Sequence, residues 1–123
     1  FKASGTNLVC QPNITVSNIK AVAKDVVIKK DLTVIADTAK VGTGYTLTLG
    51  DKTYTIIVLG DVNGDTEINS ADLLTVVRHL KGTPSITQEY VKISADINKD
   101  GEINSADLLC IVKYLKGSIK IAV

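Results

Sequence analysis

The 123-residue sequence contains no tryptophan or methionine, one phenylalanine, one histidine and two cysteines. With so few aromatic side chains, a core must be built from aliphatic residues. Two cysteines are too few for a disulfide framework. Cys10 and Cys110 are therefore interpreted as small buried thiols, and a bridge between them is left open. No apolar run reaches the roughly 18 residues that span a bilayer, so we expect no membrane insertion.

Charge is nearly balanced at +1, which argues against a nucleic-acid partner. The balance hides an asymmetry: residues 1–60 carry seven Lys and four Asp, whereas residues 61–117 carry nine acids and six bases. Most of these acids lie in two short loops, a pattern that favours a bound cation. Because the chain begins at Phe1 without methionine, we expect a fragment or mature form, and the lack of a visible signal peptide decides nothing.

Residues 1–59 are predicted to form a small β-rich module of βαβββ type. Two runs of β-branched and aromatic residues, 45–49 and 53–59, flank Gly50 and Asp51 and predict a hairpin with positive φ at one of these two. Residues 7–10 and 31–37 are further expected strands. Residues 15–25 are expected to be helical, with Thr15 or Ser17 as N-cap and Val16, Ile19, Val22 and Ala23 on one face. No catalytic constellation is visible, so we expect no enzyme.

The second half of the chain is an internal repeat. Residues 61–82 and 96–117 are identical at 15 of 22 aligned positions, and each copy is an acidic loop followed by a predicted helix. Apolar residues recur at helical spacing in both helices, and Gly82 and Gly117 stand where a glycine would end each one. Residues 85–95 are expected to form a short helix or turn, with apolar side chains directed inward. The predicted fold class is therefore α+β, with the β-rich module at 1–59 and an all-α pair of loop–helix repeats at 60–123.

Each acidic loop has the spacing of a twelve-residue calcium loop, in which side chains at the first, third, fifth, ninth and twelfth positions and the seventh carbonyl converge on the ion. These positions are occupied by Asp61, Asn63, Asp65, Glu67 (carbonyl), Asn69 and Asp72 in one loop, and by Asp96, Asn98, Asp100, Glu102 (carbonyl), Asn104 and Asp107 in the other. All the donors are hard oxygens, which favours calcium over zinc or softer metals. We therefore expect two calcium ions. The alternative for an isolated loop is a solvated acidic turn, which the in-register duplication argues against.

Three details refine this prediction. Asn69 and Asn104 are placed to cap the following helices, with Asp72 and Asp107 completing a capping box. A strand, not a helix, is expected before Asp61, unlike in a standard EF-hand. The sixth position, where a sharp turn is needed, is Thr66 in one loop and Gly101 in the other. We therefore expect the first loop to be strained and to bind calcium more weakly than the second.

Two copies of D-x-N-x-D-x-E-I-N-S-A-D-L-L, each followed by one helix that ends near glycine, resemble a dockerin. The resemblance covers residues 61–117 and implies a calcium-dependent module that binds a cohesin of a scaffoldin in cellulosome-type assemblies for polysaccharide degradation. It also implies a secreted or cell-surface location. The preceding β-rich segment resembles the small X-type modules found before dockerins.

The resemblance places cohesin recognition on the end of each loop and along each helix. The matching positions are Ser70, Ala71, Val77, Arg78 and Lys81 in the first repeat, and Ser105, Ala106, Val112, Lys113 and Lys116 in the second. Their duplication implies two related binding orientations. Val77 and Val112 fit a core role equally well, and the cations also suit the negative end of the helix dipole. His79 is interpreted as an exposed helix residue rather than a ligand or base.

The leading functional hypothesis is a non-catalytic, calcium-folded docking module. The alternative is a structural module, in which the calcium repeats stabilise the β-rich part of a surface protein that has no cohesin partner.

Overall fold

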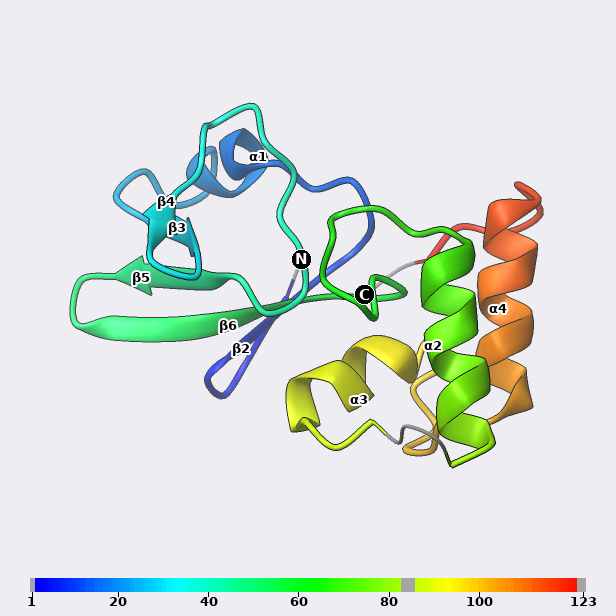
Figure 1. Ribbon diagram of the computed structural model, residues 1–123. Helices are drawn as coiled ribbons and strands as arrows, with labels where there is room; N and C mark the ends of the chain where they lie inside the picture. Colours follow the sequence, from blue (N-terminus) through cyan, green and yellow to red (C-terminus); the bar gives the residue numbers. More distant parts are fainter. Residues whose placement is uncertain (1, 83–85, 122–123) are drawn as a thin grey trace.

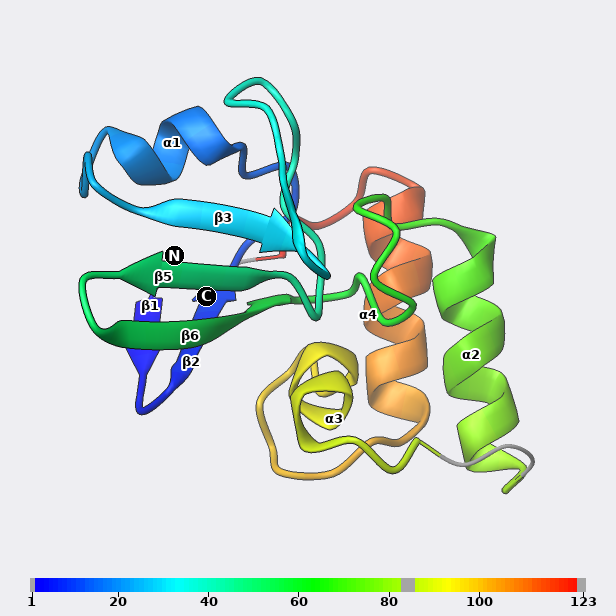
Figure 2. The same ribbon diagram turned by 60° about the vertical axis from the view of Figure 1, so that its left-hand side comes forward.

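The computed structural model describes residues 2–82 and 86–121, and it has a mixed α+β architecture (Figure 1). The strands are β1 (Lys2–Ser4), β2 (Asn7–Cys10), β3 (Val27–Lys30), β4 (Thr33–Val34), β5 (Thr46–Leu49) and β6 (Lys52–Val58), and the helices are α1 (Val16–Lys20), α2 (Ser70–Leu80), α3 (Glu89–Ala95) and α4 (Ser105–Leu115). Figure 2 shows the sheet and α1 on one side, α2 and α4 side by side on the other, and α3 between them.

The six strands form one sheet in the order β1-β2-β6-β5-β3-β4. The predicted hairpin is confirmed as β5 and β6, which pair antiparallel up to Leu49 and Lys52 around a turn in which Gly50 has φ 64°. The strand predicted at 7–10 is also confirmed, and it pairs parallel with β6 from Asn7 opposite Thr55 to Cys10 opposite Val58. β6 therefore pairs with β5 from Lys52 to Thr55 and with β2 from Thr55 to Val58.

Three sequence predictions for this half are wrong. The βαβββ pattern omits β1 and β3, which are short and rich in polar residues, so alternation does not reveal them. Residues 31–37 contain only the two-residue strand β4. The helix runs from Thr15, its N-cap, only to Lys20, so Val22 leaves the buried face and is 74% exposed.

Buried apolar side chains gather in two clusters. The first lies between α1 and the sheet and includes Val16, Ile19 and Ile28. The second joins Leu59, at the end of β6, to Val76 of α2 and Ile111 of α4. Its position explains why α2 and α4 lie against each other and why α3 contacts β6.

The predicted helix features of the repeat are largely confirmed. Asn69 and Asn104 are the N-caps of α2 and α4, each within a complete capping box. Gly82 and Gly117 follow the helices with φ 79° and 76°. His79 is half-buried rather than exposed, and its Nδ1 accepts a hydrogen bond from the Ile86 N–H at 2.8 Å.

Cys10 and Cys110 are both free thiols, so the bridge left open by the sequence is not formed. Cys10 is fully buried, as expected, whereas Cys110 is only half-buried on α4. Burial raises the pKa of the Cys10 thiol to about 12, so this residue behaves as a small apolar side chain.

Candidate metal centre

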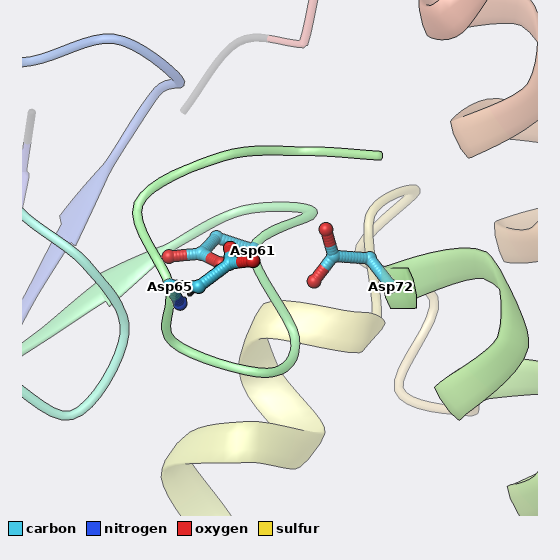
Figure 3. Close-up of side chains that lie close together, drawn as sticks. All are labelled: Asp61, Asp65 and Asp72. Carbon is cyan, nitrogen blue, oxygen red and sulfur yellow. Dashed lines mark hydrogen bonds between the residues drawn. The ribbon is translucent and has the colours of Figure 1, made fainter. Parts of the chain in front are cut away.

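The first acidic loop gathers three carboxylates at one point. Oxygen atoms of Asp61, Asp65 and Asp72 all lie within 4.8 Å of one another. Figure 3 shows the Asp72 carboxylate, at the start of α2, pointing toward Asp61 and Asp65. Asp61 and Asp72 are fully buried and Asp65 is exposed, so the group is open to solvent on one side.

Backbone N–H groups hold these carboxylates in place. The Asp65 N–H donates to Asp61 Oδ1 at 3.2 Å, and the Thr66 N–H donates to Asp61 Oδ2 at 3.0 Å. The two Asp72 oxygens accept from the N–H groups of Asn63, at 3.1 Å, and Asn69, at 2.9 Å. One carboxylate therefore closes the loop and starts α2 at the same time.

The second loop repeats this arrangement. Asp96, Asp100 and Asp107 also bring carboxylate oxygens within 4.8 Å of one another. Asp96 accepts from the N–H groups of Asp100, at 3.3 Å, and Gly101, at 2.9 Å. Asp107 accepts from Asn98 and Asn104 at 3.2 Å and 3.0 Å. The two loops thus share the backbone hydrogen bonds that hold their first and twelfth residues.

The electrostatics of the clusters favour a cation. The pKa of Asp61 is raised to about 7, chiefly by burial and also by the nearby charge of Asp72, although hydrogen bonds from the N–H groups of Thr43 and Thr66 oppose the shift. Burial likewise raises the pKa of Asp72 and of Asp96. The Asp100 pKa is lowered, chiefly by the hydrogen bond from the Glu102 N–H. Carboxylates held this close repel one another unless a positive charge lies between them.

Within the described part of the chain, no side-chain cation pairs with the clustered aspartates. Over residues 2–82 and 86–121, the ion pairs are Lys20–Asp37 and Lys40–Glu67, and neither includes a clustered aspartate. Buried carboxylates without a cationic partner normally coordinate a metal or become neutral. Three carboxylates, with amide and carbonyl oxygens nearby, form the donor set that calcium prefers. The residues of these clusters therefore fit bound calcium.

The remaining predicted ligands lie in the same loops. The side chains of Asn63 and Asn98 contact the fifth-position aspartates, Asp65 and Asp100, at 3.4 Å and 3.3 Å. Asn69 and Asn104 use Oδ1 to accept from the second residue of each helix. The Glu67 carboxylate pairs with Lys40 at 3.0 Å, and the predicted role of the Glu67 carbonyl as a ligand stays a prediction.

Both loops require positive φ at two positions. At the fourth position these are Gly64 (75°) and Lys99 (61°), and at the sixth they are Thr66 (75°) and Gly101 (90°). Each loop thus has one glycine and one non-glycine residue in the left-handed region. The predicted positive φ at the sixth position is confirmed in both loops, with the β-branched Thr66 in the first. The second loop has a non-glycine residue of its own in this region, Lys99, which the sequence did not reveal. The weaker calcium binding of the first loop stays a prediction. Thr66 is still the more strained residue, since it is β-branched.

A comparison with protein families matches residues 59–116 to the dockerin type I domain. These residues form a dockerin domain. Dockerins are non-catalytic modules that bind calcium and dock onto cohesins. The match leaves the β-rich part outside it, so the X-type resemblance stays a prediction. The comparison with curated proteins gave no match. None of the helices in the described ranges is long and apolar enough to cross a bilayer.

The residues predicted to contact a cohesin lie on the outer faces of the dockerin helices. Val77 and Val112 are half-buried. The other predicted contact residues are exposed: Ser70, Ala71, Arg78 and Lys81, and their equivalents Ser105, Ala106, Lys113 and Lys116. A shallow apolar groove is lined by Ser70, Ala71, Leu73, Leu74 and Val77.

Sequence analysis did not single out Leu74 and Leu109, which occupy equivalent positions in the two repeats. Leu74 is 47% exposed and Leu109 is 51% exposed, although both are large and apolar. Each is the second residue of a repeated Leu-Leu pair, one position beyond the buried stripe. That offset could have identified them, because a helix turns the second leucine away from the face that buries the first.

Proposed function

We propose that residues 60–123 are a docking module that binds two calcium ions and a cohesin, and that residues 1–59 are a separate β-rich module preceding it. The observation that carries this proposal is the pair of carboxylate clusters, each at the start of a helix, in a chain segment that matches the dockerin family. We propose that the folded module attaches its parent protein to a scaffoldin at the cell surface or outside the cell.

The mechanism is a linkage between folding and ion binding. Calcium neutralises the clustered carboxylates and stabilises the folded state by mass action. Asp72 and Asp107 transmit this effect to the helices, because each carboxylate accepts N–H groups from within the loop and from the helix cap. The ordered helices then present a continuous outer face of small, apolar and cationic side chains to the partner.

Calorimetry tests the first half of the proposal. Calcium titrated into the chelator-treated protein is expected to bind at two sites. A cohesin panel, with retention measured in calcium and in chelator, tests the second half. Two bound ions with no cohesin retained would overturn the docking function. Retention in chelator as strong as in calcium would contradict the linkage.

The repeat symmetry also supports two binding orientations. Ala71→Arg and Ala106→Arg, made separately, are each expected to retain cohesin binding, because the other repeat still offers an intact surface. The double variant is expected to lose it. If one single variant already abolishes binding while calcium still binds at both sites, the two-orientation proposal is wrong.

A structural role is the second candidate, and contacts between the two modules favour it. The Ser94 hydroxyl of α3 donates to the Val58 carbonyl of β6 at 2.7 Å, and the Thr43 hydroxyl lies 3.3 Å from the Ser94 hydroxyl oxygen. A calcium-dependent gain in the stability of the sheet, with no cohesin bound at any calcium concentration, would favour this role over docking.

A further inference from the structure

The two calcium loops differ in what surrounds them. Asp61, the first residue of the first loop, is fully buried, whereas its equivalent Asp96 is only half-buried. Their internal hydrogen bonds agree in partners and closely in length. The difference in burial therefore comes from outside the loop. Residues 40–44 of the β-rich part lie against the first loop and contribute to this burial.

Thr43 connects this segment directly to the first loop. Its N–H donates to Asp61 Oδ2 at 3.2 Å, across 18 positions of sequence. The same oxygen accepts the Thr66 N–H, so Asp61 has one hydrogen bond that Asp96 lacks among the described contacts. A further contact lies at the loop's seventh position, where Lys40 Nζ is 3.0 Å from Glu67 Oε1.

Thr43 is itself held rigidly. Its side chain is buried, and its hydroxyl oxygen accepts from the Val58 N–H at 3.0 Å and donates toward the Val58 carbonyl at 3.1 Å. Val58 ends β6, only three residues before Asp61. The hydroxyl therefore fixes the Thr43 N–H to the strand from which the loop starts.

Two glycines show how closely the backbones approach. A Cβ on Gly64 would lie 2.5 Å from the Thr43 carbonyl oxygen, which real side chains do not tolerate. A Cβ on Gly42 would lie 3.0 Å from the Gly64 carbonyl oxygen and 3.2 Å from Asp61 Oδ2. The equivalent of Gly64 in the second loop is Lys99, which carries a full side chain and is exposed. The contact with residues 40–44 is thus specific to the first loop.

We propose that Thr43 is a positioning residue of the first calcium loop, so that the β-rich module sets the calcium affinity of this loop and not of the second. The proposal rests on the proposed function, since it requires that the first loop binds calcium. Hydrogen bonds that orient a ligand from outside the ligand set commonly change metal affinity by about 10–100-fold. The Thr43 hydroxyl does not contact Asp61 itself but positions the N–H that does. We therefore expect its removal to lower the calcium affinity of the first loop by about 10-fold, the lower end of this range.

The test is a calcium titration followed by NMR, with the amides of residues 66 and 101 reporting the two loops separately. Thr43→Val keeps the shape and the N–H but removes the hydroxyl. It is expected to weaken the first site about 10-fold and leave the second unchanged. Thr43→Ser, which keeps the hydroxyl, is expected to restore most of the loss. Thr48→Val, on β5, is the matched control and is expected to change neither site.

The outcomes separate this inference from the proposed function. If neither loop of the unaltered protein binds calcium, the proposed function fails. If both loops bind and Thr43→Val leaves the first site unchanged, or weakens both sites equally, only the positioning role fails.

A second measurement needs no variant, which matters if Thr43→Val does not fold. Coupling between two sites is reciprocal, so calcium is expected to slow hydrogen exchange of the Thr43 amide in the unaltered protein. An exchange rate that is the same with and without calcium would overturn the proposal.

Discussion

Replacing Thr66 by glycine is expected to stabilise the calcium-saturated protein. Thr66 has φ 75°, a conformation that costs a β-branched residue about 1–2 kcal/mol. Glycine has more freedom in the unfolded chain, which offsets about 0.5–1 kcal/mol of the gain. The net stabilisation is therefore about 1 kcal/mol, or about fivefold in the unfolding equilibrium.

Urea unfolding in saturating calcium measures this change, because the loop is closed in the folded state under these conditions. Lys99→Gly is the matched variant of the second loop. Lysine is not β-branched and has φ 61°, close to the centre of the left-handed region, so its strain is smaller. For Lys99→Gly, the backbone strain relieved in the folded state and the entropic cost of glycine's extra freedom in the unfolded chain are expected to cancel to within about 0.5 kcal/mol.

Two results would refute this reasoning. Thr66→Gly could stabilise the protein no more than Lys99→Gly does, or it could destabilise it. Either would mean that the φ of the sixth position does not limit closure of the first loop. The relative affinities of the two loops would then depend on their surroundings alone.

Three further predictions follow from the contacts. Gly64→Ala is expected to destabilise the protein by at least about 2 kcal/mol more than Gly117→Ala, because only the former adds a clash with Thr43 to the cost of positive φ; equal losses in urea unfolding would contradict this. Asn104→Ala is expected to lower the free energy of unfolding by about 1 kcal/mol, because the N-cap of α4 is lost. An unchanged free energy of unfolding, followed by the circular dichroism of the helices, would disprove this prediction. In chelator, lowering the pH from 7 to 5 is expected to raise the melting temperature. The pKa of Asp61 is raised from 3.8 to about 7 in the folded state, chiefly by burial, so the folded state binds the proton more tightly than the unfolded state. A melting temperature that falls over this pH range would contradict the prediction.

The loops, helix caps and helix ends were predictable because each depends on residues within about one loop length of one another. Asp72 closes its loop and caps its helix through partners at most nine positions away. The hairpin was predictable for the same reason, since Gly50 and Asp51 separate two runs that pair directly. Strands β1 and β3 were not, because their pairing partners, and not their own patterns, hold them in the sheet.

The sequence by itself determined that an acidic loop occurs twice, with oxygen donors at the spacing of a calcium loop and a helix after each copy. Only the tertiary structure decided that the copies are unequal. Folding of the sheet places Thr43 against Asp61, whereas over residues 2–82 and 86–121 Asp96 accepts no such hydrogen bond from the β-rich part. The same contact explains why the first loop has glycine at its fourth position while the second has Lys99: the Thr43 carbonyl leaves no room for a side chain at Gly64. Such a contact joins distant parts of the chain and leaves no periodicity in the sequence.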